Sequence, residues 1–338
     1  EAGADCAETR SVEAVINSGC LRAKLLRPYD FAHRAKPLAD AISRMEDPFD
    51  CECTLLALMY LNAAMAGART MLTGLDGEHA VGAPSNYIRR LIGGGSWTEA
   101  WRESKGFSRH YYRGALSPPV IFFRALRSSL TPELLRSTKR KLATHRRYRQ
   151  LVAPAALPAG LARRVDLPGR LVEYELGRCA KSNAAIRDWH RHVMQVPYLT
   201  AAVERYERLA SYFGVETRHP LLDVRLLRFS NALPLAQKVR DGWSKYMLRS
   251  LADKRLPATV AWREGWEEIG WKFNFKLAEA LLPDSGLSVA TSPSPYPVDH
   301  LDRINSSGPP RYDPDLIRSW RDFQFHLWLS RGNLVFPG

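Results

Sequence analysis

The sequence predicts an α/β fold in which a doubly wound parallel sheet is joined to a large helical portion. Three observations predict it. A helix, a short apolar strand and a glycine-containing loop follow one another within residues 40–88. Helical spacing of apolar residues dominates much of the remaining chain. The 338 residues are 45% hydrophobic and 25% charged, which is ordinary for a folded globular protein and excludes a disordered or collagen-like chain.

Residues 40–88 are predicted to form one crossover unit within a nucleotide-binding core over 1–88. An Ala-, Leu- and Met-rich helix is expected from Thr54, with Gly67 as its stop signal. A short, buried, apolar strand is expected next, from Arg69 to Leu72, and it opens into the loop TGLDGEHAVG at 73–82. Ligands bind outside the carboxyl ends of parallel strands, so this loop is the first candidate site.

A strongly basic stretch follows, within a predicted helical insertion and connector over 89–170. Nine Lys or Arg but only one acidic residue lie between Arg124 and Arg149. The whole chain has a formal net charge of +14, which implies an anionic partner such as a nucleotide, a nucleic acid, an acidic protein or a membrane surface. Loosely helical apolar spacing predicts solvated helices here, and the Pro- and Gly-rich residues 152–169 are expected to connect two lobes.

A helical lobe is predicted over 171–283. Apolar residues at helical spacing predict a helix that ends at Gly214. Asp223 is a good N-cap for a helix that Pro234 stops. The last part of the chain, 284–338, is expected to form a surface loop and a closing amphipathic helix.

The turn Asp241-Gly242 is expected to lead into one more helix of this lobe. Ser244 is a possible N-cap, and the helix is predicted to run from Lys245 to Leu256, before a proline.

Two groups of residues could carry chemistry at a phosphate. The loop supplies a hydroxyl, small residues and a carboxylate for Mg²⁺ within six positions: Thr73, Gly74, Gly77 and Glu78. Lys245 and Arg249 are four residues apart, so on a helix they share a face and can clamp a polyphosphate. An ordinary turn and an ordinary surface pair are the alternatives that the sequence leaves open.

Cysteine usage and hydropathy indicate the compartment. The five Cys form no disulfide framework, which points to a reducing compartment and makes the cytoplasm the default. The longest apolar stretch, 53–68, is shorter than the ~20 residues that cross a bilayer, so no membrane association is expected. The chain does not begin with Met, which indicates a fragment or a processed chain.

Three ordered segments resemble asparagine synthetases and their relatives. GARTMLTGLDGEHAVG at 67–82 is similar to the family segment VVLSG.GADELFGG. ERYERLASYFGVETRHPLLDVRLLRFSNALP at 204–234 is similar to the family's EvR.PfLD region. KVRDGWSKYMLRSLADKRLP at 238–257 is similar to K...g..Ky.LR.a....lP. The resemblance is specific in these segments and weaker over most of the rest of the chain.

The resemblance implies an adenine nucleotide alpha hydrolase-like fold and an ATP- and Mg²⁺-dependent ligase. Such enzymes adenylate a carboxylate, release pyrophosphate, and let ammonia or an amine displace AMP to form an amide. Carried over, it implies that Lys245 stabilises pyrophosphate with Arg249 positioning it, and that Glu78 takes the metal-binding position. Leu72, Thr73, Gly74 and Gly77 would contact ATP, and Arg218 and Asp223 would shape the site.

The chain departs from the family in four respects. Leu75 stands where asparagine synthetase has a Glu, and an apolar side chain cannot act as a base or hold ammonia. Glu78 replaces an Asp and is longer by one methylene, and His79 replaces a Glu. The pyrophosphate loop SGG.DS does not occur in the sequence, and its place would lie before Glu1. Without that loop and the glutaminase domain with its leading Cys, weak activity or none is expected of this chain.

The resemblance makes asparagine biosynthesis, with glutamine as the ammonia source, the default function. Because of the departures, three other functions stay open. One is an enzyme of a biosynthetic cluster, similar to lasso-peptide cyclases or β-lactam synthetases, acting on a peptide or small-molecule carboxylate. Another is an inactive pseudoenzyme subunit. The basic stretch would suit a nucleic-acid-binding protein, which is the outside alternative. Against it, the stretch contains one tyrosine, Tyr148, and no RNA-binding motif.

Overall fold

The computed structural model describes most of the chain from residue 7 to residue 264. The described ranges are 7–19, 22–27, 33–45, 54–152, 159–182, 189 and 192–264, together with the single positions 273, 276, 277, 280 and 328. The surface loop predicted within 284–338 and all but Trp328 of the predicted closing helix lie outside the described residues.

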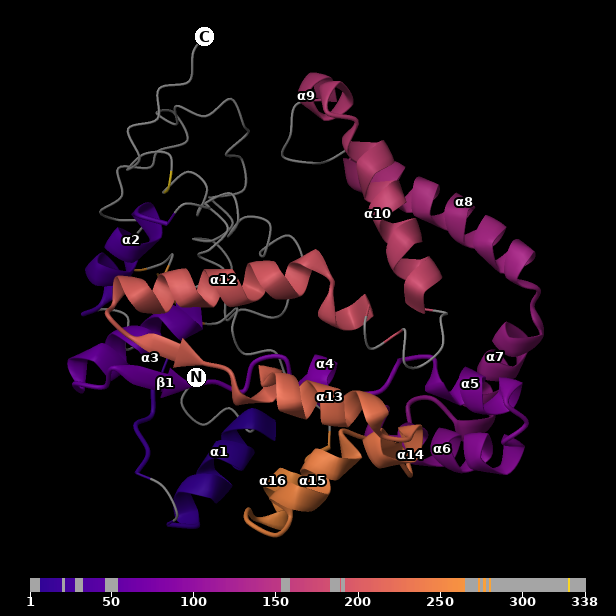
Figure 1. Cartoon of the computed structure of the whole chain (residues 1–338), viewed down its shortest axis with the longest axis horizontal. Helices are drawn as coiled ribbons and strands as arrows, with labels where there is room; N and C mark the ends of the chain where they lie inside the picture. The colour runs from indigo at the N-terminus through magenta and orange to yellow at the C-terminus, as the bar shows by residue number, and fades with distance from the viewer. Residues whose placement is uncertain are drawn as a thin grey trace.

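Helices predominate in the described part of the chain (Figure 1). Those before residue 153 are α1 (Ala7–Asn17), α2 (Ala35–Ser43), α3 (Thr54–Met65), α4 (Gly77–Val81), α5 (Tyr87–Gly93), α6 (Trp97–His110), α7 (Pro118–Leu130) and α8 (Glu133–Val152). Those after it are α9 (Ala159–Arg164), α10 (Leu167–Ser182), α12 (Pro197–Tyr212), the 3₁₀ helix η3 (Pro220–Leu222), α13 (Val224–Ala232), α14 (Leu235–Lys238), α15 (Tyr246–Ala252) and α16 (Ala258–Ala261).

Two short sheets accompany these helices. β1 (Thr70–Leu72) and β2 (Glu216–Arg218) pair in parallel, with Met71 opposite Thr217. β3 (Val239–Arg240) and β4 (Trp243–Ser244) form an antiparallel hairpin. The described residues therefore have an α/β architecture with few strands, and the doubly wound sheet stays a prediction.

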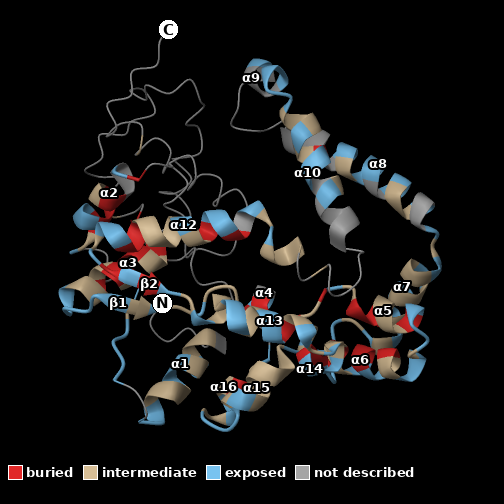
Figure 2. Ribbon diagram, viewed as in Figure 1, coloured by how far each residue is buried: buried red, intermediate tan, exposed pale blue. Residues whose placement is uncertain are grey.

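The main hydrophobic core forms where α12 packs on α3 and β2 (Figure 2). Met71 of β1 packs against this core, whereas Leu72 is 68% exposed. The strand predicted over 69–72 is confirmed, but the prediction that it is buried was wrong. Successive side chains of a strand point to opposite faces, and only the Met71 face meets the helices. The largest fully buried apolar residues of the core are Leu38, Leu58, Tyr60, Leu209 and Leu277.

A second hydrophobic cluster holds α5, α6 and α7 together and reaches the hairpin through Val239. Rings of Tyr87 and Phe107 meet edge to face, with their centroids 6.2 Å apart. Trp101 and Phe122 meet in the same manner at 5.4 Å. This cluster fixes α6 next to the hairpin, which becomes important for the candidate site.

The basic stretch lies on α7 and α8, and α8 packs against α10 (Figure 1). The predicted solvated helices are confirmed, since Leu130 and Leu142 are exposed along with many charged residues there. Within the predicted connector 152–169, the structure has α9 and the first residues of α10, and the role of this segment between two lobes stays a prediction. Pro168 stands in the first turn of α10, where a missing backbone N–H costs nothing.

Several predicted helix ends are confirmed by the structure. α3 ends at Met65, and Gly67 has a φ of +77°. Gly214, with a φ of +70°, follows α12. The side chain of Asp223 caps α13 by accepting a hydrogen bond from the Arg225 N–H at 2.8 Å.

The last predicted helix begins differently from the expectation. Ser244 belongs to β4 and is not the N-cap of α15. Lys245 takes the N-cap position with a left-handed φ of 56°, and α15 ends at Ala252, four residues before the predicted end. The hairpin overrides the capping preference, because its pairing keeps Ser244 extended.

Candidate active site

The candidate active site lies where β1 and β2 end. The ladder between the two strands continues past β1, because the Thr73 N–H donates to the Arg218 carbonyl at 2.9 Å. Thr73 and His219 therefore lie side by side at the carboxyl ends of two parallel strands. This is the edge at which open α/β sheets bind ligands.

The strand-edge loop, residues 73–78, is held by side-chain contacts to the segment after β2. Thr73 Oγ1 lies 2.6 Å from His219 Nδ1. The Leu75 N–H points back to Thr73 Oγ1 at 3.4 Å. Asp76 has a φ of 58° and precedes α4 as its N-cap residue. The loop thus makes a tight turn between β1 and α4.

Two of the predicted glycines differ in their surroundings. A Cβ at Gly74 would meet no heavy atom within 4 Å, so the protein's own packing does not require glycine there. A Cβ at Gly77 would lie 2.8 Å from Leu221 Cδ1. The absent side chain of Gly77 therefore lets η3 pack against the start of α4.

The short helix α4 is anchored from behind. Ser230 Oγ of α13 donates a hydrogen bond to the Ala80 carbonyl at 2.5 Å, and Ser230 is fully buried. At the other end of α4, the Gly82 N–H donates to the Glu78 carbonyl at 2.9 Å. The carboxylate of Glu78 stays 80% exposed. The backbone of α4 is fixed, while its one acidic side chain faces outward.

Lys245 reaches this loop from the hairpin. Its Nζ lies 3.1 Å from Glu78 Oε1, and its side chain is 29% exposed. Two segments far apart in the sequence therefore converge at Glu78 and Lys245. Phosphate binding between these two segments stays a prediction.

Glu103 supports the hairpin from α6. Its two carboxylate oxygens accept the N–H groups of Asp241 and Gly242 at 2.7 and 2.8 Å, at the two turn residues that have positive φ. Burial raises the pKa of Glu103, and the two backbone hydrogen bonds oppose that rise. The Tyr87 hydroxyl donates to the same carboxylate at 3.5 Å. Burial and the neighbouring Glu103 raise the pKa of Tyr87. The turn before Lys245 is thus fastened to α6.

Arg249 is engaged by the backbone around it. Its guanidinium donates to the carbonyls of Ser244 and Ala261, both at 2.9 Å, and lies over the ring of Trp243 at 4.9 Å. Burial and the neighbouring Arg263 lower its pKa. Arg249 joins the hairpin to α16, and its predicted contact with phosphate stays a prediction.

The residues carried over from the EvR.PfLD motif hold local structure. Arg218 pairs with Glu216 on β2 at 2.9 Å. Asp223 caps α13 and pairs with the Arg225 guanidinium at 2.7 Å, and these hydrogen bonds lower the pKa of Asp223 to about 2. Both residues flank the strand edge, and the ion pairs described for them are with Glu216 and Arg225 rather than with Glu78 or Lys245.

The site fits a magnesium ion that arrives with a nucleotide. Among the described residues no group of three or more His, Cys, Asp or Glu is placed to hold a metal. Mg²⁺ at a nucleotide is commonly held by one or two carboxylates together with phosphates and water. Glu78, with its exposed carboxylate at the strand edge, can supply one such oxygen.

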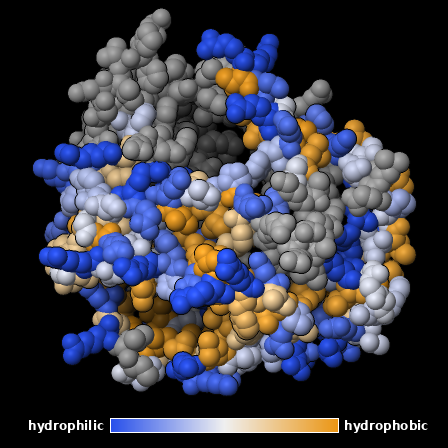
Figure 3. Space-filling model, viewed as in Figure 1, coloured by the Kyte–Doolittle hydropathy of each residue, from blue (hydrophilic) through white to orange (hydrophobic). Residues whose placement is uncertain are grey.

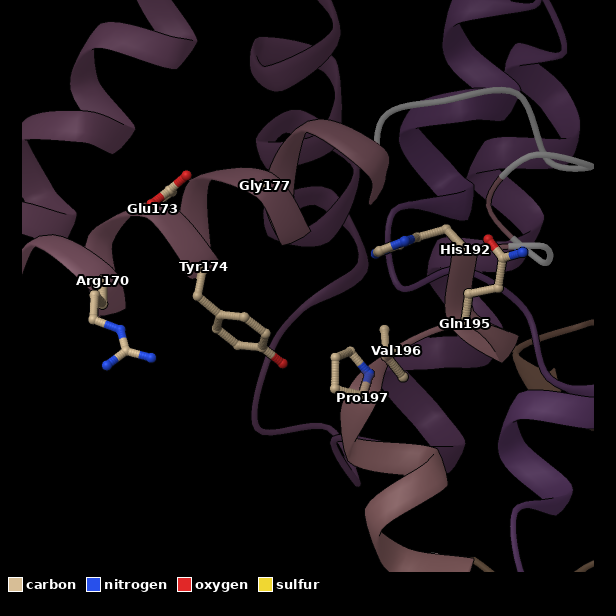
Figure 4. Close-up of a pocket in the computed structure, with 8 residues that line it drawn as sticks. All are labelled: Arg170, Glu173, Tyr174, Gly177, His192, Gln195, Val196 and Pro197. Atoms are coloured by element: carbon tan, nitrogen blue, oxygen red, sulfur yellow. The ribbon is translucent and has the colours of Figure 1, made fainter. Parts of the chain in front are cut away.

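A separate cavity of about 460 Å³ lies between α10 and the segment that leads into α12 (Figure 4). Arg170, Glu173 and Tyr174 line it from α10, and His192 and Gln195 line it from the other side. Its far rim is the first turn of α12, and β2 follows the last turn of that 16-residue helix, a length of about 24 Å at 1.5 Å per residue. The cavity is distinct from the strand edge.

Two polar residues of the site were missed by sequence reasoning: Glu103 and His219. His219 lies inside the segment that resembles the family's EvR.PfLD region, so its position beside the strand end was available as a signal. Glu103 gave no signal, because it occurs on an ordinary charged helix and its partners are backbone groups 138 and 139 residues away.

The fold and the site together define an α/β protein that places a fixed ammonium and a carboxylate at the carboxyl ends of two parallel strands. A family model described as asparagine synthase matches residues 22–271, which are 250 of the 338 residues. The chain belongs to the asparagine synthase family, whose members are ATP-dependent amide-bond ligases. No curated protein and no solved structure matches the chain.

Figure 3 shows apolar residues on the surface over the part of the molecule that contains α13, α15 and α16. Val224 and Phe229 of α13 and Leu251 of α15 are each more than half exposed.

In the described ranges, no helix has both the length and the apolar character that a bilayer crossing demands.

Proposed function

We propose that this chain is an ATP-dependent ligase that adenylates a carboxylate, releases pyrophosphate, and forms an amide with ammonia or an amine. The observation that carries the proposal is the 3.1 Å contact between Lys245 Nζ and Glu78 Oε1. It brings the hairpin and the strand-edge loop to one place, as a single triphosphate site requires. Membership of the asparagine synthase family supports the reaction class.

Lys245 has the role of stabilising the leaving pyrophosphate. Adenylation develops negative charge on the pyrophosphate, and an ammonium that is already in position neutralises it without reorganisation. The fastened turn before Lys245 supplies that position, because Glu103 holds the Asp241 and Gly242 N–H groups. Arg249, which donates to neighbouring carbonyls, has the supporting role of holding the start of α15.

The strand-edge loop has the role of holding ATP and its metal. The exposed side chain of Leu72 offers an apolar surface to the nucleotide, and the open space beside Gly74 lets a ligand approach the backbone closely. Glu78 would hold Mg²⁺, which supplies charge neutralisation at the phosphates. Gly77 contributes by allowing η3 to pack behind the loop.

The substrates are the finer part of the proposal. Aspartate, with ammonia delivered from glutamine by a glutaminase, is the family default, and the cytoplasm is the expected location. Leu75 favours a second candidate, a peptide or specialised small-molecule carboxylate, because an apolar side chain cannot hold ammonia. The two are distinguished by which carboxylate supports the reaction.

The test is Mg²⁺-dependent exchange of labelled pyrophosphate into ATP, with L-aspartate as the first carboxylate. It uses the full-length protein with any sequence that precedes Glu1, because weak activity or none is expected without the SGG.DS loop. We expect Lys245→Met to lower the exchange rate at least about 100-fold, since removing one preorganised charge-stabilising group typically costs that much. Lys254→Met is the matched control, because Lys254 is an exposed lysine of the same segment. Its exchange rate should equal that of the unaltered chain.

The other outcomes are equally informative. Exchange with a panel of small-molecule and peptide carboxylates but not with aspartate would establish the second candidate. ATP binding without exchange for any carboxylate would contradict the ligase and indicate a pseudoenzyme subunit. Equal rates for Lys245→Met and Lys254→Met would remove Lys245 from the reaction.

A further inference from the structure

Three side chains form a chain of polar contacts at the strand edge. Thr73 Oγ1 lies 2.6 Å from His219 Nδ1, and His219 Nε2 lies 3.4 Å from Glu207 Oε1. The same Glu207 oxygen accepts a hydrogen bond from the Thr217 hydroxyl. The residues come from three places: Thr73 follows β1, Glu207 lies on α12, and Thr217 and His219 lie on and after β2.

The hydrogen bonds determine which ring nitrogen carries the proton. Nε2 lies 3.4 Å from both Glu207 Oε1 and Thr217 Oγ1. The carboxylate only accepts, and the Thr217 hydroxyl has its proton on Glu207, so Nε2 carries the hydrogen and Nδ1 keeps a free electron pair. The Thr73 hydroxyl then donates its only proton to His219 Nδ1.

His219 is the buried middle member of this chain, and Thr73 and Glu207 lie at its more exposed ends. The His219 side chain is 9% exposed, and Thr217 is buried in the sheet. Thr73 is partly exposed and is followed by exposed Gly74. The hydroxyl keeps a lone pair that faces the ligand side, because the Leu75 N–H occupies only one of its two acceptor positions.

We propose that Thr73, His219 and Glu207 form a proton relay that accepts the proton of the attacking amine in the second step of the reaction. The inference rests on the proposed function. Amide formation from an acyl adenylate requires a base, because the nitrogen loses a proton as it becomes acylated. At the strand-edge loop, Leu75 has no titratable group and Glu78 is paired with Lys245. Asp76 precedes α4 as its N-cap residue, and its Oδ2 is buried away from the ligand side.

The step balances as follows. The amine nitrogen forms a bond to the acyl carbon, and the bond from that carbon to the AMP oxygen breaks, with the electron pair leaving on AMP. The nitrogen gives its proton to Thr73 Oγ1 while Thr73 passes its own proton to His219 Nδ1. The imidazolium that forms is stabilised by the Glu207 carboxylate. Thr73 contacts the reacting nitrogen, and His219 acts through it.

The charged groups around His219 are compatible with this role. The charged side chain next to the ring is Glu207 of α12, and the Glu207 side chain is 42% exposed. On β2, Arg218 is paired with Glu216 at 2.9 Å. These contacts place a negative charge next to Nε2, on the side away from Thr73.

The test separates the two half-reactions in the full chain. The first is pyrophosphate exchange with ATP, Mg²⁺ and L-aspartate, and the second is amide formation on adding ammonium chloride. His219→Asn places an amide oxygen near the former Nδ1, so it can still accept the Thr73 hydrogen bond but cannot take up a proton. We expect amide formation to fall about 100-fold and exchange to change less than about 3-fold.

A second variant sharpens the measurement. Glu207→Gln removes the negative charge that stabilises the imidazolium, so it should lower amide formation and leave exchange within about 3-fold of the unaltered rate. The matched control is His145→Asn, an exposed histidine on α8, which should leave both half-reactions unaltered.

Two results would overturn the relay: amide formation at the unaltered rate in His219→Asn, or an equal loss in both half-reactions, which would indicate a structural role. Absence of exchange in the unaltered chain would instead count against the proposed function. In that event nitrogen NMR of labelled imidazole still decides the relay. A ring protonated on Nε2 supports it, and a ring protonated on Nδ1 contradicts it.

Discussion

The two sides of the candidate site are built in different ways. The hairpin side is fastened by buried groups: Glu103 binds both turn N–H groups, and Gly106 of α6 lies directly against the Asp241 carbonyl. The strand-edge side is more open, with Leu72 exposed and free space beside Gly74. Each side presents one charge to the other, through Lys245 and Glu78.

The difference assigns separate tasks to the two sides. A group that stabilises developing charge must be held in place before the reaction, and the fastened hairpin does this for Lys245. A group that admits a nucleotide and its metal needs space, and the strand-edge loop provides it. The comparison predicts that stability depends on the hairpin side far more than on the strand-edge side.

The largest expected effect comes from adding one methyl group on each side. Gly106→Ala would overlap the backbone carbonyl of Asp241. We expect it to lower the free energy of unfolding by about 3 kcal/mol. The overlap outweighs the ~1 kcal/mol by which alanine is favoured over glycine in a helix. Gly74→Ala, which meets no neighbouring atom, should change stability by less than about 0.5 kcal/mol. Denaturant unfolding measures both, and equal values would refute the comparison.

A smaller effect is expected for Glu103→Gln. An amide can accept one of the two turn N–H groups but turns its NH₂ towards the other, so we expect a loss of about 2 kcal/mol. Burial raises the pKa of Glu103, so the folded protein favours the neutral acid. The stability of the unaltered chain should therefore fall as the pH rises from the ordinary glutamate pKa through the raised one.

The Gln variant, which cannot ionise, should lack this fall. Urea unfolding at several pH values between 4 and 7 tests it. A constant difference between the two proteins over that range would contradict the assigned cause.

The smallest expected effect concerns Lys238, the last residue of α14 before the hairpin. It is 1% exposed, and burial lowers its pKa to about 8. Between that pKa and the unfolded value near 10.5 the unfolded chain binds more protons, so stability should rise with pH. We expect a gain of about 1 kcal/mol between pH 7 and pH 9.

Lys238→Met removes the titrating group and keeps an unbranched apolar stem. The slope of unfolding free energy against pH over this range should be smaller in the variant than in the unaltered chain. Parallel slopes would show that another group is responsible.

Much of the fold could be predicted from sequence pattern. Apolar spacing and the glycine after it identified α12, and Asp223 was identified as the cap of α13. These predictions succeeded because helix spacing and caps depend on neighbours within a few positions. The start of α15 could not be predicted in the same way, because the hairpin keeps Ser244 extended and places Lys245 in a left-handed conformation.

The candidate site divides in the same manner. The residue types of Thr73, Glu78 and Lys245 pointed to phosphate chemistry, since a hydroxyl, a carboxylate and an ammonium are the groups that such a site needs. The exposure of Leu72 was not predictable, because burial depends on which face of β1 the helices cover. Nor was the contact of His219 with Thr73, which joins residues 146 positions apart.

By itself, then, the order of residues determined many of the helices, several of their ends, the charge of the chain and the membership of its family. Only the tertiary structure decided that Lys245 meets Glu78, that Glu103 fastens the turn behind it, and that a histidine joins the two strand ends. The physical reason is range: helix propensity and capping act within one or two turns, whereas these hydrogen bonds and ion pairs exist only after distant segments have packed together.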